Sequence, residues 1–187
     1  MKRVMIVGQP GSGKSRLAQA LGDRTGLPVV HIDKIHWQAG WVERSKADKT
    51  RLCEEVEQSE RWIFEGGHSA TWPSRVARAD MLVWLDRPVA LRLWRVVRRA
   101  ITGLGRTRSD MAEGCPEQLR TLPEFIRYIW TTRNSGRAKL AKLAASAPPG
   151  CQVVHLRSDR EVARFVSAFL PLGRDGASHS GQPIAYR

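Results

Sequence analysis

One stretch of eight residues near the start of the sequence, GQPGSGKS at 8–15, constrains the fold of this 187-residue chain more than any other feature. It fits the pattern G-x-x-x-x-G-K-[ST], with Gly8, Gly13, Lys14 and Ser15 in the defining positions. A short apolar run at 2–7 precedes the stretch, and a segment with helical periodicity at 14–24 follows it. This order of strand, loop and helix places a bound phosphate at a helix N-terminus. We call residues 8–15 the phosphate loop.

Each residue type in the phosphate loop has a role in binding a polyphosphate. Glycines allow positive φ and close backbone approach, so that successive N–H groups point inward and form an anion site. Lys14 supplies a positive charge between the β and γ phosphates, and the Ser15 hydroxyl is a ligand for Mg²⁺. The sequence therefore predicts ATP and Mg²⁺ as cofactors, and the alternative is a glycine-rich turn with an incidental lysine. The predicted cradle consists of Gly8, Gly11, Ser12, Gly13, Lys14 and Ser15.

The length and the cysteine content limit the class of protein. A chain of 187 residues is long enough to bury one core without disulfides or structural metals. The three cysteines, Cys53, Cys115 and Cys151, form no C-x-x-C pair, which argues against a disulfide framework and a zinc site and fits a reducing compartment. The N-terminal apolar run is too short for a signal peptide, and no apolar stretch reaches the roughly 20 residues of a membrane span. We therefore expect a cytoplasmic location and no membrane partner.

The net charge of +13 is concentrated in the middle of the chain. Residues 71–140 contain 14 Lys and Arg against 6 Asp and Glu. A positive field of this kind attracts anions, which include phosphorylated metabolites, nucleotides and nucleic acid. A solvated basic surface is the simpler interpretation for most of the individual arginines.

Strands and helices alternate along the sequence through five predicted strands. This alternation predicts an α/β fold of three layers, a P-loop NTPase sandwich whose five-stranded parallel sheet has helices on both faces. Residues 1–170 form a single domain, and a long helix is expected at about 116–145. The polar, Gly- and Ser-containing segment 171–187 is expected to be a disordered tail. The predicted strands are at 2–7, 29–32, 62–65, 81–85 and 152–156.

Acidic residues follow three of these strands. Asp33, Glu65 and Asp86 come out at the carboxyl edge of the sheet, where open α/β sheets bind ligands. Asp33 could accept a proton from an attacking hydroxyl, orient an acceptor or hold a Mg²⁺-bound water, or it could only cap a helix or turn. Glu65 is predicted to join Ser15 at the metal.

The residues around these acids suggest an acceptor pocket. Trp37 and Trp41 could form a stacking face for a base or ring, or the private hydrophobic cluster of a lid. Gly66 and Gly67 allow the backbone to approach a ligand closely, and Arg75 follows on a short helix. We take these five residues, with Asp33, as candidate substrate contacts.

Arginines dominate the second half of the predicted domain. Arg92, Arg95 and Arg99 fall on one face of a helix that begins near residue 89, a spacing that permits a phosphate clamp without requiring one. The glycine-containing segment at about 102–118 is the best candidate for a mobile lid. Closing it would bring positive charge onto the transferring phosphoryl group and exclude water. Candidate catalytic arginines are Arg99, Arg106, Arg108 and Arg133.

Several sequence strings resemble known proteins. The segment Leu85-Asp86-x-Pro88 followed by Arg95-x-x-x-Arg99 is similar to a pattern in adenylate kinase, within the small P-loop kinase group that also includes shikimate kinase. The strings HIDKIHW at 31–37, ADMLVWLD at 79–86, GRTRSDMAEGCPE at 105–117 and YIW at 128–130 resemble a bacterial adenylate-kinase-like subfamily often labelled DNA topology modulation proteins. The resemblance covers roughly residues 1–170 and implies that Arg95 lies near the ATP base and that Arg99 contacts phosphate. The chain departs from this pattern at Glu65, Ser109 and His68.

The motifs and the resemblance together favour one function over two rivals. The favoured function is an ATP-dependent kinase that transfers the γ-phosphoryl group of Mg-ATP to a small acceptor, preferably a nucleotide or nucleoside. The first alternative is a nucleic-acid-associated regulatory P-loop ATPase, suggested by the charge and by the label of the subfamily. No helix-turn-helix, zinc module or aromatic platform is recognisable in the sequence, so nucleic acid is not the favoured partner. The second alternative is a kinase fold that binds nucleotide without catalysis.

Overall fold

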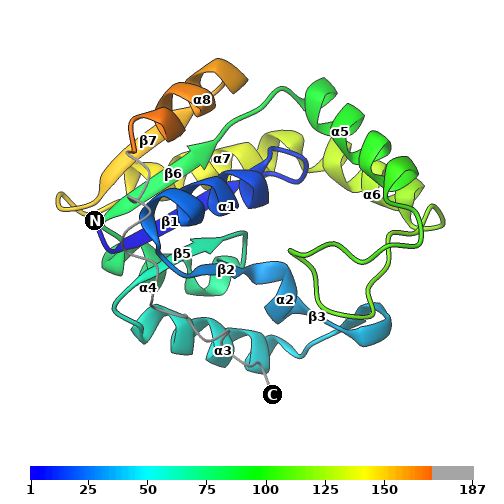
Figure 1. Cartoon of the computed structure of the whole chain (residues 1–187), viewed down its shortest axis with the longest axis horizontal. Coiled ribbons are helices and arrows are strands. Elements are labelled where there is room, and N and C mark those ends of the chain that lie inside the picture. The colour runs from blue at the N-terminus through cyan, green and yellow to red at the C-terminus, as the bar shows by residue number, and fades with distance from the viewer. Residues whose placement is uncertain (170–187) are drawn as a thin grey trace.

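Five parallel strands form the central sheet in the computed structural model, which describes residues 1–169. The strand order is β2–β5–β1–β6–β7 (Figure 1). This confirms the predicted sheet, whereas the predicted tail at 171–187 lies outside the described residues. The strands are β1 (Arg3–Gly8), β2 (Val29–His31), β5 (Trp62–Glu65), β6 (Met81–Leu85) and β7 (Gln152–Leu156).

The central strand β1 pairs with β5 on one side and β6 on the other. The chain therefore leaves β1 first toward one edge of the sheet and later toward the other. In open α/β sheets the crevice at such a switch point is where ligands bind, at the carboxyl ends of the strands. The phosphate loop follows β1 directly, so it lies at this position.

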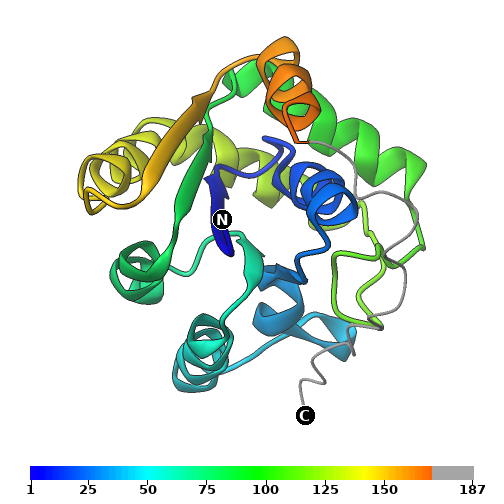
Figure 2. The same ribbon diagram turned by 60° about the vertical axis from the view of Figure 1, so that its left-hand side comes forward.

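Helices cover both faces of the sheet, as predicted, and give three layers (Figure 2). Helices α1 (Lys14–Thr25) and α8 (Asp159–Ser167) pack on one face. Helices α3 (Lys46–Gln58), α4 (Trp72–Arg78) and α7 (Arg133–Ala145) pack on the other face. The strands of such a sheet are buried on both sides, which explains why all five residues of β6 are apolar and buried.

Side-chain caps fix the starts of two of these helices. Ser45 Oγ accepts the backbone N–H of Asp48 at 3.1 Å, and Ser158 Oγ accepts that of Glu161 at 3.1 Å. Each cap satisfies one of the helix N–H groups that lack a partner within the helix, a contribution of about 1 kcal/mol.

The segment after β2 is more ordered than its irregular sequence suggests. It forms the short helix α2 (Ile32–His36) and then a hairpin of β3 (Trp37–Gln38) and β4 (Val42–Glu43), joined by the 3₁₀ turn η1 (Ala39–Trp41). Asp33 consequently lies in the first turn of α2 and not in the loop directly after the strand.

The prediction of a single helix at about 116–145 is wrong, because two helices occupy this range. Helix α6 (Leu122–Thr131) ends before α7 begins, and Gln9 of the phosphate loop lies at the junction. Its amide Nε2 donates to the carbonyl oxygens of Thr132, at 3.2 Å, and Arg133, at 3.0 Å. A Cβ at Gly136 would lie 2.7 Å from this Nε2, so glycine is needed for the approach. A side chain inserted at the backbone is a common cause of a helix break.

A loop at 103–121 connects α5 (Val89–Thr102) to α6 and occupies the position of the predicted lid. It crosses to the β3–β4 hairpin (Figure 1). The N–H of Gly40 donates to the carbonyl of Gly114 at 2.9 Å, and Trp41 Nε1 donates to that of Pro116 at 2.9 Å. We call 103–121 the lid loop. A further 3₁₀ turn, η2 (Ser69–Thr71), precedes α4. Within 1–169 no helix is long and apolar enough to cross a membrane.

Candidate active site

The phosphate loop has the backbone geometry of an anion cradle. Gly11 and Gly13 have φ of 77° and 98°, as predicted, and Gly13 is the N-cap of α1. Gly8 is required for space, because a Cβ there would lie 2.6 Å from Ser12 Oγ and 2.7 Å from the carbonyl oxygen of Leu85. Ser12 Oγ is buried and has no hydrogen-bond partner among the described residues 1–169. A buried hydroxyl of this kind is costly unless a ligand or water completes it, which fits a phosphate oxygen.

Ser15 and Glu65, the predicted metal ligands, are in direct contact. Ser15 Oγ donates to Glu65 Oε1 at 3.0 Å, and His31 Nδ1 lies 2.9 Å from the same carboxylate oxygen. The parallel register of β2 and β5 pairs His31 with Glu65, which explains how this contact forms. A hydroxyl and a carboxylate are the oxygen ligands that Mg²⁺ prefers, so the two residues fit the ion. Within 1–169 no group of three or more His, Cys, Asp and Glu residues is placed to share a metal.

Asp33 lies close to this pair. Burial raises the pKa of its carboxyl group, and the Glu65 carboxylate raises it further, whereas Lys14 and Arg108 lower it. A carboxyl group with a raised pKa is a better proton acceptor at neutral pH than an ordinary aspartate. The structure thus brings Asp33, Lys14 and Glu65 together at the carboxyl edge of the sheet.

Two of the predicted catalytic arginines meet above the site, on α5 and on the lid loop. Arg99 Nε lies 3.0 Å from Glu117 Oε1, and Arg108 Nη1 lies 3.3 Å from the same oxygen. Arg108 Nε is also 3.0 Å from Asp110 Oδ1. Burial and the neighbouring charge of Arg108 lower the pKa of Arg99. The two guanidinium groups are therefore neutralised by carboxylates of the lid loop itself.

Asp110 connects the lid loop to the phosphate loop. Burial raises the pKa of its carboxyl group, but the charge of Arg108 and a hydrogen bond with Ser15 lower it below the ordinary value. The lid loop thus approaches the predicted metal ligands with a carboxylate as well as with an arginine.

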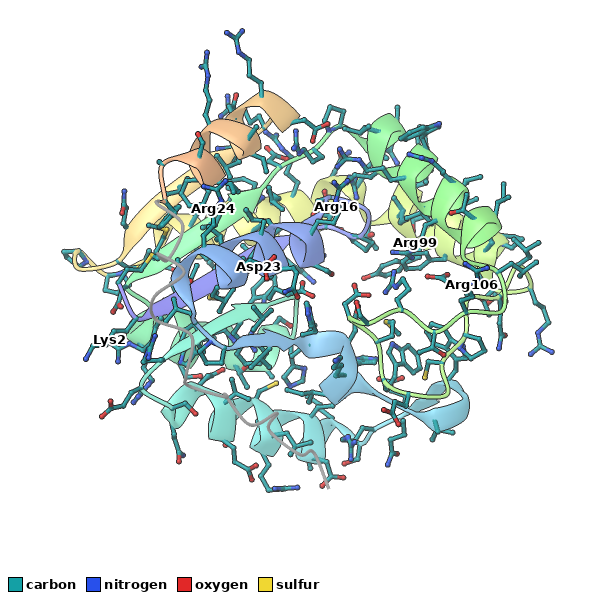
Figure 3. The ribbon with its side chains drawn as sticks, in the orientation of Figure 1. Lys2, Arg16, Asp23, Arg24, Arg99 and Arg106 are labelled. Atoms are coloured by element: carbon teal, nitrogen blue, oxygen red, sulfur yellow. The ribbon has the colours of Figure 1, made fainter. Side chains whose placement is uncertain are left out.

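Within 1–169 the side chains of the remaining predicted arginines form no ion pair with Glu117 or Asp110. Arg106 is exposed, at the start of the lid loop, and Figure 3 labels it with Arg99. Arg133 lies over the Trp130 ring, 4.2 Å from its centroid, beside the junction of α6 and α7. Arg95 Nη1 donates to the Ser12 carbonyl at 3.2 Å, and its Nη2 donates to Asp159 Oδ1 and Oδ2, at 2.8 Å each. Arg95 thus contacts the phosphate loop through its side chain, and Arg133 does so through its backbone carbonyl, which accepts from Gln9.

Arg75 conflicts with its predicted role as a substrate contact. Its side chain is fully buried, and its guanidinium group donates to Glu57, to the Gly66 carbonyl and to Thr71 Oγ1. It also lies 3.7 Å from the centroid of the Phe64 ring. A guanidinium that is buried and paired in this way holds the protein together and is not accessible to an acceptor molecule.

Gly66 also has a structural role that its sequence position does not reveal. Its φ is 107°, and a Cβ would lie 2.0 Å from Ile32 Cγ2. Gly66 therefore lets β5 end against the first turn of α2, which carries Asp33. Gly67 is different, since a Cβ there would be 3.6 Å from the Trp72 ring, an ordinary contact.

The two tryptophans of the hairpin pack together and against the lid loop. The ring centroids of Trp37 and Trp41 are 5.4 Å apart in an edge-to-face arrangement. The Trp41 indole is held by its hydrogen bond to the Pro116 carbonyl. Cys115 Sγ donates to the Gln38 carbonyl at 3.2 Å on the same surface. These contacts favour a hydrophobic cluster of the lid loop over an open stacking face.

Asp86, the third predicted acid, does not join Asp33 and Glu65 and pairs with Arg137.

Sequence reasoning missed three residues of the site. His31 was treated only as part of a strand, and its contact with Glu65 follows from the strand register. Asp110 and Glu117 lie within the string at 105–117, and the sequence pattern predicts no role for either. Carboxylates spaced closely among the lid arginines are a signal that could have identified them.

Solved structures match this chain, whereas comparisons with protein-family models and with curated protein sequences find no match. A shikimate kinase from Acinetobacter baumannii in complex with shikimate has 15% sequence identity over 90% of both chains, with a TM-score of 0.52. A deoxyadenosine kinase from M. mycoides with bound dATP has 13% identity over 90% of this chain and 98% of that chain, with a TM-score of 0.51. The chain therefore has the fold of the P-loop kinases, and the phosphate loop occupies the switch point of that fold.

Proposed function

We propose that the chain is an ATP-dependent kinase that transfers the γ-phosphoryl group of Mg-ATP to a small acceptor, with a nucleotide or nucleoside favoured. The observation that carries the proposal is the position of Asp33, a carboxylate with a raised pKa beside Lys14 and Glu65. Phosphoryl transfer needs mainly positioning and charge stabilisation, so a phosphate loop, arginines and one proton acceptor are sufficient. The kinase fold of the matched structures supports the proposal.

The phosphate loop would bind the triphosphate. The inward N–H groups and Lys14 hold the β and γ phosphates, and the free Ser12 Oγ completes the cradle. Ser15 and Glu65 would hold Mg²⁺, which neutralises developing charge on the phosphate oxygens when it is bound. His31 Nδ1 contacts Glu65 Oε1 and would fix the orientation of this carboxylate.

Asp33 and the lid loop would act on the transferred group. Asp33 accepts the proton of the attacking acceptor hydroxyl, or orients that hydroxyl. Arg99 and Arg108, now paired with Glu117, would exchange this carboxylate for the γ-phosphoryl oxygens, because a phosphoryl group carries more charge than a carboxylate. Arg95, between Ser12 and Asp159, is in position to contact the base of ATP.

The acceptor pocket would lie between α2, the hairpin and the lid loop. Gly67 is open enough for an approaching ligand, and Trp37 and Trp41 would form the apolar wall. The matched structures include a shikimate kinase and a deoxyadenosine kinase, as their names state. The resemblance to the DNA topology modulation subfamily supports a nucleotide or nucleoside as the proposed acceptor.

A labelled-phosphate assay tests the proposed reaction. The full chain is incubated with Mg²⁺ and ATP labelled at the γ position, with nucleoside monophosphates, nucleosides, shikimate-like hydroxy acids or short single-stranded DNA offered separately. Lys14→Ala serves as the blank, and its far-UV circular dichroism verifies folding. Removing one such charge should slow transfer by at least about 100-fold.

The outcomes separate the three functions. Label on one small acceptor, absent with Lys14→Ala, supports the kinase. Label released only as free phosphate, and faster with DNA, would identify the regulatory ATPase in its place. Equal transfer by Lys14→Ala and the unaltered chain contradicts the proposed role of the phosphate loop, and nucleotide binding without release or transfer supports a non-catalytic binding protein.

A further inference from the structure

A second concentration of arginine lies on the far side of the phosphate loop, in a groove of about 440 Å³. The groove lies between the phosphate loop, the turn from β6 to α5, the first turns of α7 and the end of β7. Five arginines and one carboxylate are its charged lining residues. We call it the arginine groove, and its lining residues are Gln9, Asp86, Arg87, Pro88, Val89, Arg92, Arg133, Asn134, Arg137 and Arg157.

Carboxylates pair with two of the five groove arginines, Arg137 and Arg87. Asp86 accepts from Arg137 Nε at 3.0 Å and also contacts His155 Nε2 at 3.1 Å. Asp159 is shared by Arg87 and by Arg95 outside the groove. Within 1–169, no ion pair forms at the three other groove arginines, Arg92, Arg133 and Arg157.

Two of the guanidinium groups are also buried. The Arg87 side chain is 2% exposed, and its Nε has no hydrogen-bond partner in the described part of the chain. Arg92 is 2% exposed, and within residues 1–169 it donates only to backbone carbonyls, to that of Arg87 at 3.2 Å and to that of Pro10 at 3.5 Å. Buried guanidinium groups are costly unless they are paired, and Arg92 has no ion pair within 1–169, so an anion in the groove would supply its missing partner.

The groove is distinct from the proposed phosphoryl-transfer site. Its lining includes none of Asp33, Glu65 and Lys14. Gln9 is the residue of the phosphate loop that lines it, and its amide is turned toward α7, where it binds the Thr132 and Arg133 carbonyls. The groove therefore borders the phosphate loop at Gln9 and includes none of the three residues of the proposed transfer site.

We propose that the arginine groove is a second anion site, which binds a small ligand with two or more phosphoryl groups. Guanidinium forks bind phosphate oxygens in pairs, and a recess with several uncompensated positive charges selects a multiply charged ligand. A compact ligand fits better than a nucleic acid, because the charges converge in one recess between four elements and do not follow a stripe along the surface.

Calorimetric titration of the full chain with inorganic tripolyphosphate tests this site. Lys14→Ala weakens the phosphate loop, so the binding that it retains reports the groove. In this background, Arg137→Gln or Arg157→Gln should weaken binding by roughly tenfold or more, as expected for one charge-assisted contact. Asn134→Glu, which adds a negative charge to the groove and removes no arginine, should do the same. Arg164→Gln, an exposed arginine on α8, is the control of equal charge loss and should leave binding unchanged.

Three results would overturn the proposal. The first is a complete loss of tripolyphosphate binding in Lys14→Ala, which would leave the phosphate loop as the single site. The second is equal binding by the groove variants and by Arg164→Gln. The third is binding of short single-stranded DNA, but not of tripolyphosphate, through the same arginines with a steep dependence on salt.

Discussion

Replacing Gly66 with alanine should destabilise the protein strongly, because the new Cβ has no room. It would lie 2.0 Å from Ile32 Cγ2 and 2.9 Å from Ile32 Cβ, on a backbone with a φ of 107°. Overpacking of a core costs about 1–3 kcal/mol, and a strained backbone conformation costs about as much again. We therefore expect Gly66→Ala to lower the free energy of unfolding by about 2 to 6 kcal/mol. Urea denaturation followed by tryptophan fluorescence measures this loss.

Gly67→Ala is the matched control one residue away. Its Cβ would be 3.6 Å from the Trp72 ring, and its φ is not in the left-handed region, so its free energy of unfolding should change by less than about 1 kcal/mol. Adding Ile32→Ala to Gly66→Ala should give a double variant that is more stable than the sum of the two single changes predicts. Equal stability of Gly66→Ala and Gly67→Ala would refute the argument that Gly66 is required for the contact between β5 and α2.

Three further predictions follow from individual contacts. Asp33→Asn should raise the free energy of unfolding at pH 7, while phosphoryl transfer falls. Because the pKa of Asp33 is raised in the folded protein, its ionised carboxylate destabilises the fold at pH values above 3.8, the ordinary pKa of the group. Unfolding at pH 7 and at about pH 3 should show this gain disappear at the lower pH. Asp80→Asn should cost about 1 kcal/mol at neutral pH and nothing below pH 2. Burial raises the pKa of Asp80, but hydrogen bonds from the Lys2 amide and from Arg3 lower it to about 2, so this stability is lost as the pH falls from 3.8 toward that value. Trp41→Phe removes the indole hydrogen bond to the lid loop and should speed amide hydrogen exchange at 103–121, without changing exchange in β1.

The contact between the hairpin and the lid loop bears on how the proposed kinase would close. Trp41 has a φ of 63°, which is unusual for a residue other than glycine, and its indole donates to the Pro116 carbonyl. Strained residues of this kind persist where the surrounding contacts hold them. The hairpin therefore connects the lid loop to α2. Asp33 on α2 and Arg108 on the lid loop would consequently be held in position relative to the same bound ligand.

The amino-acid sequence by itself determined the parallel sheet, the phosphate loop and the position of Glu65 at the carboxyl end of a strand. These features depend on local patterns, since apolar runs predict strands, the glycine spacing predicts the loop, and parallel strands end at a common edge. The helix caps at Ser45 and Ser158 belong to the same group, because a cap acts within three residues of itself.

Only the tertiary structure decided which side chains meet across the chain. His31 reaches Glu65 because β2 and β5 are in register, and Arg75 is buried because α4 packs against the end of β5. Arg133 lies in the arginine groove because Gln9 meets the backbone at the start of α7 and the long helix breaks there. Each of these outcomes rests on the packing of segments far apart in the sequence, and residue type and spacing do not encode that packing locally.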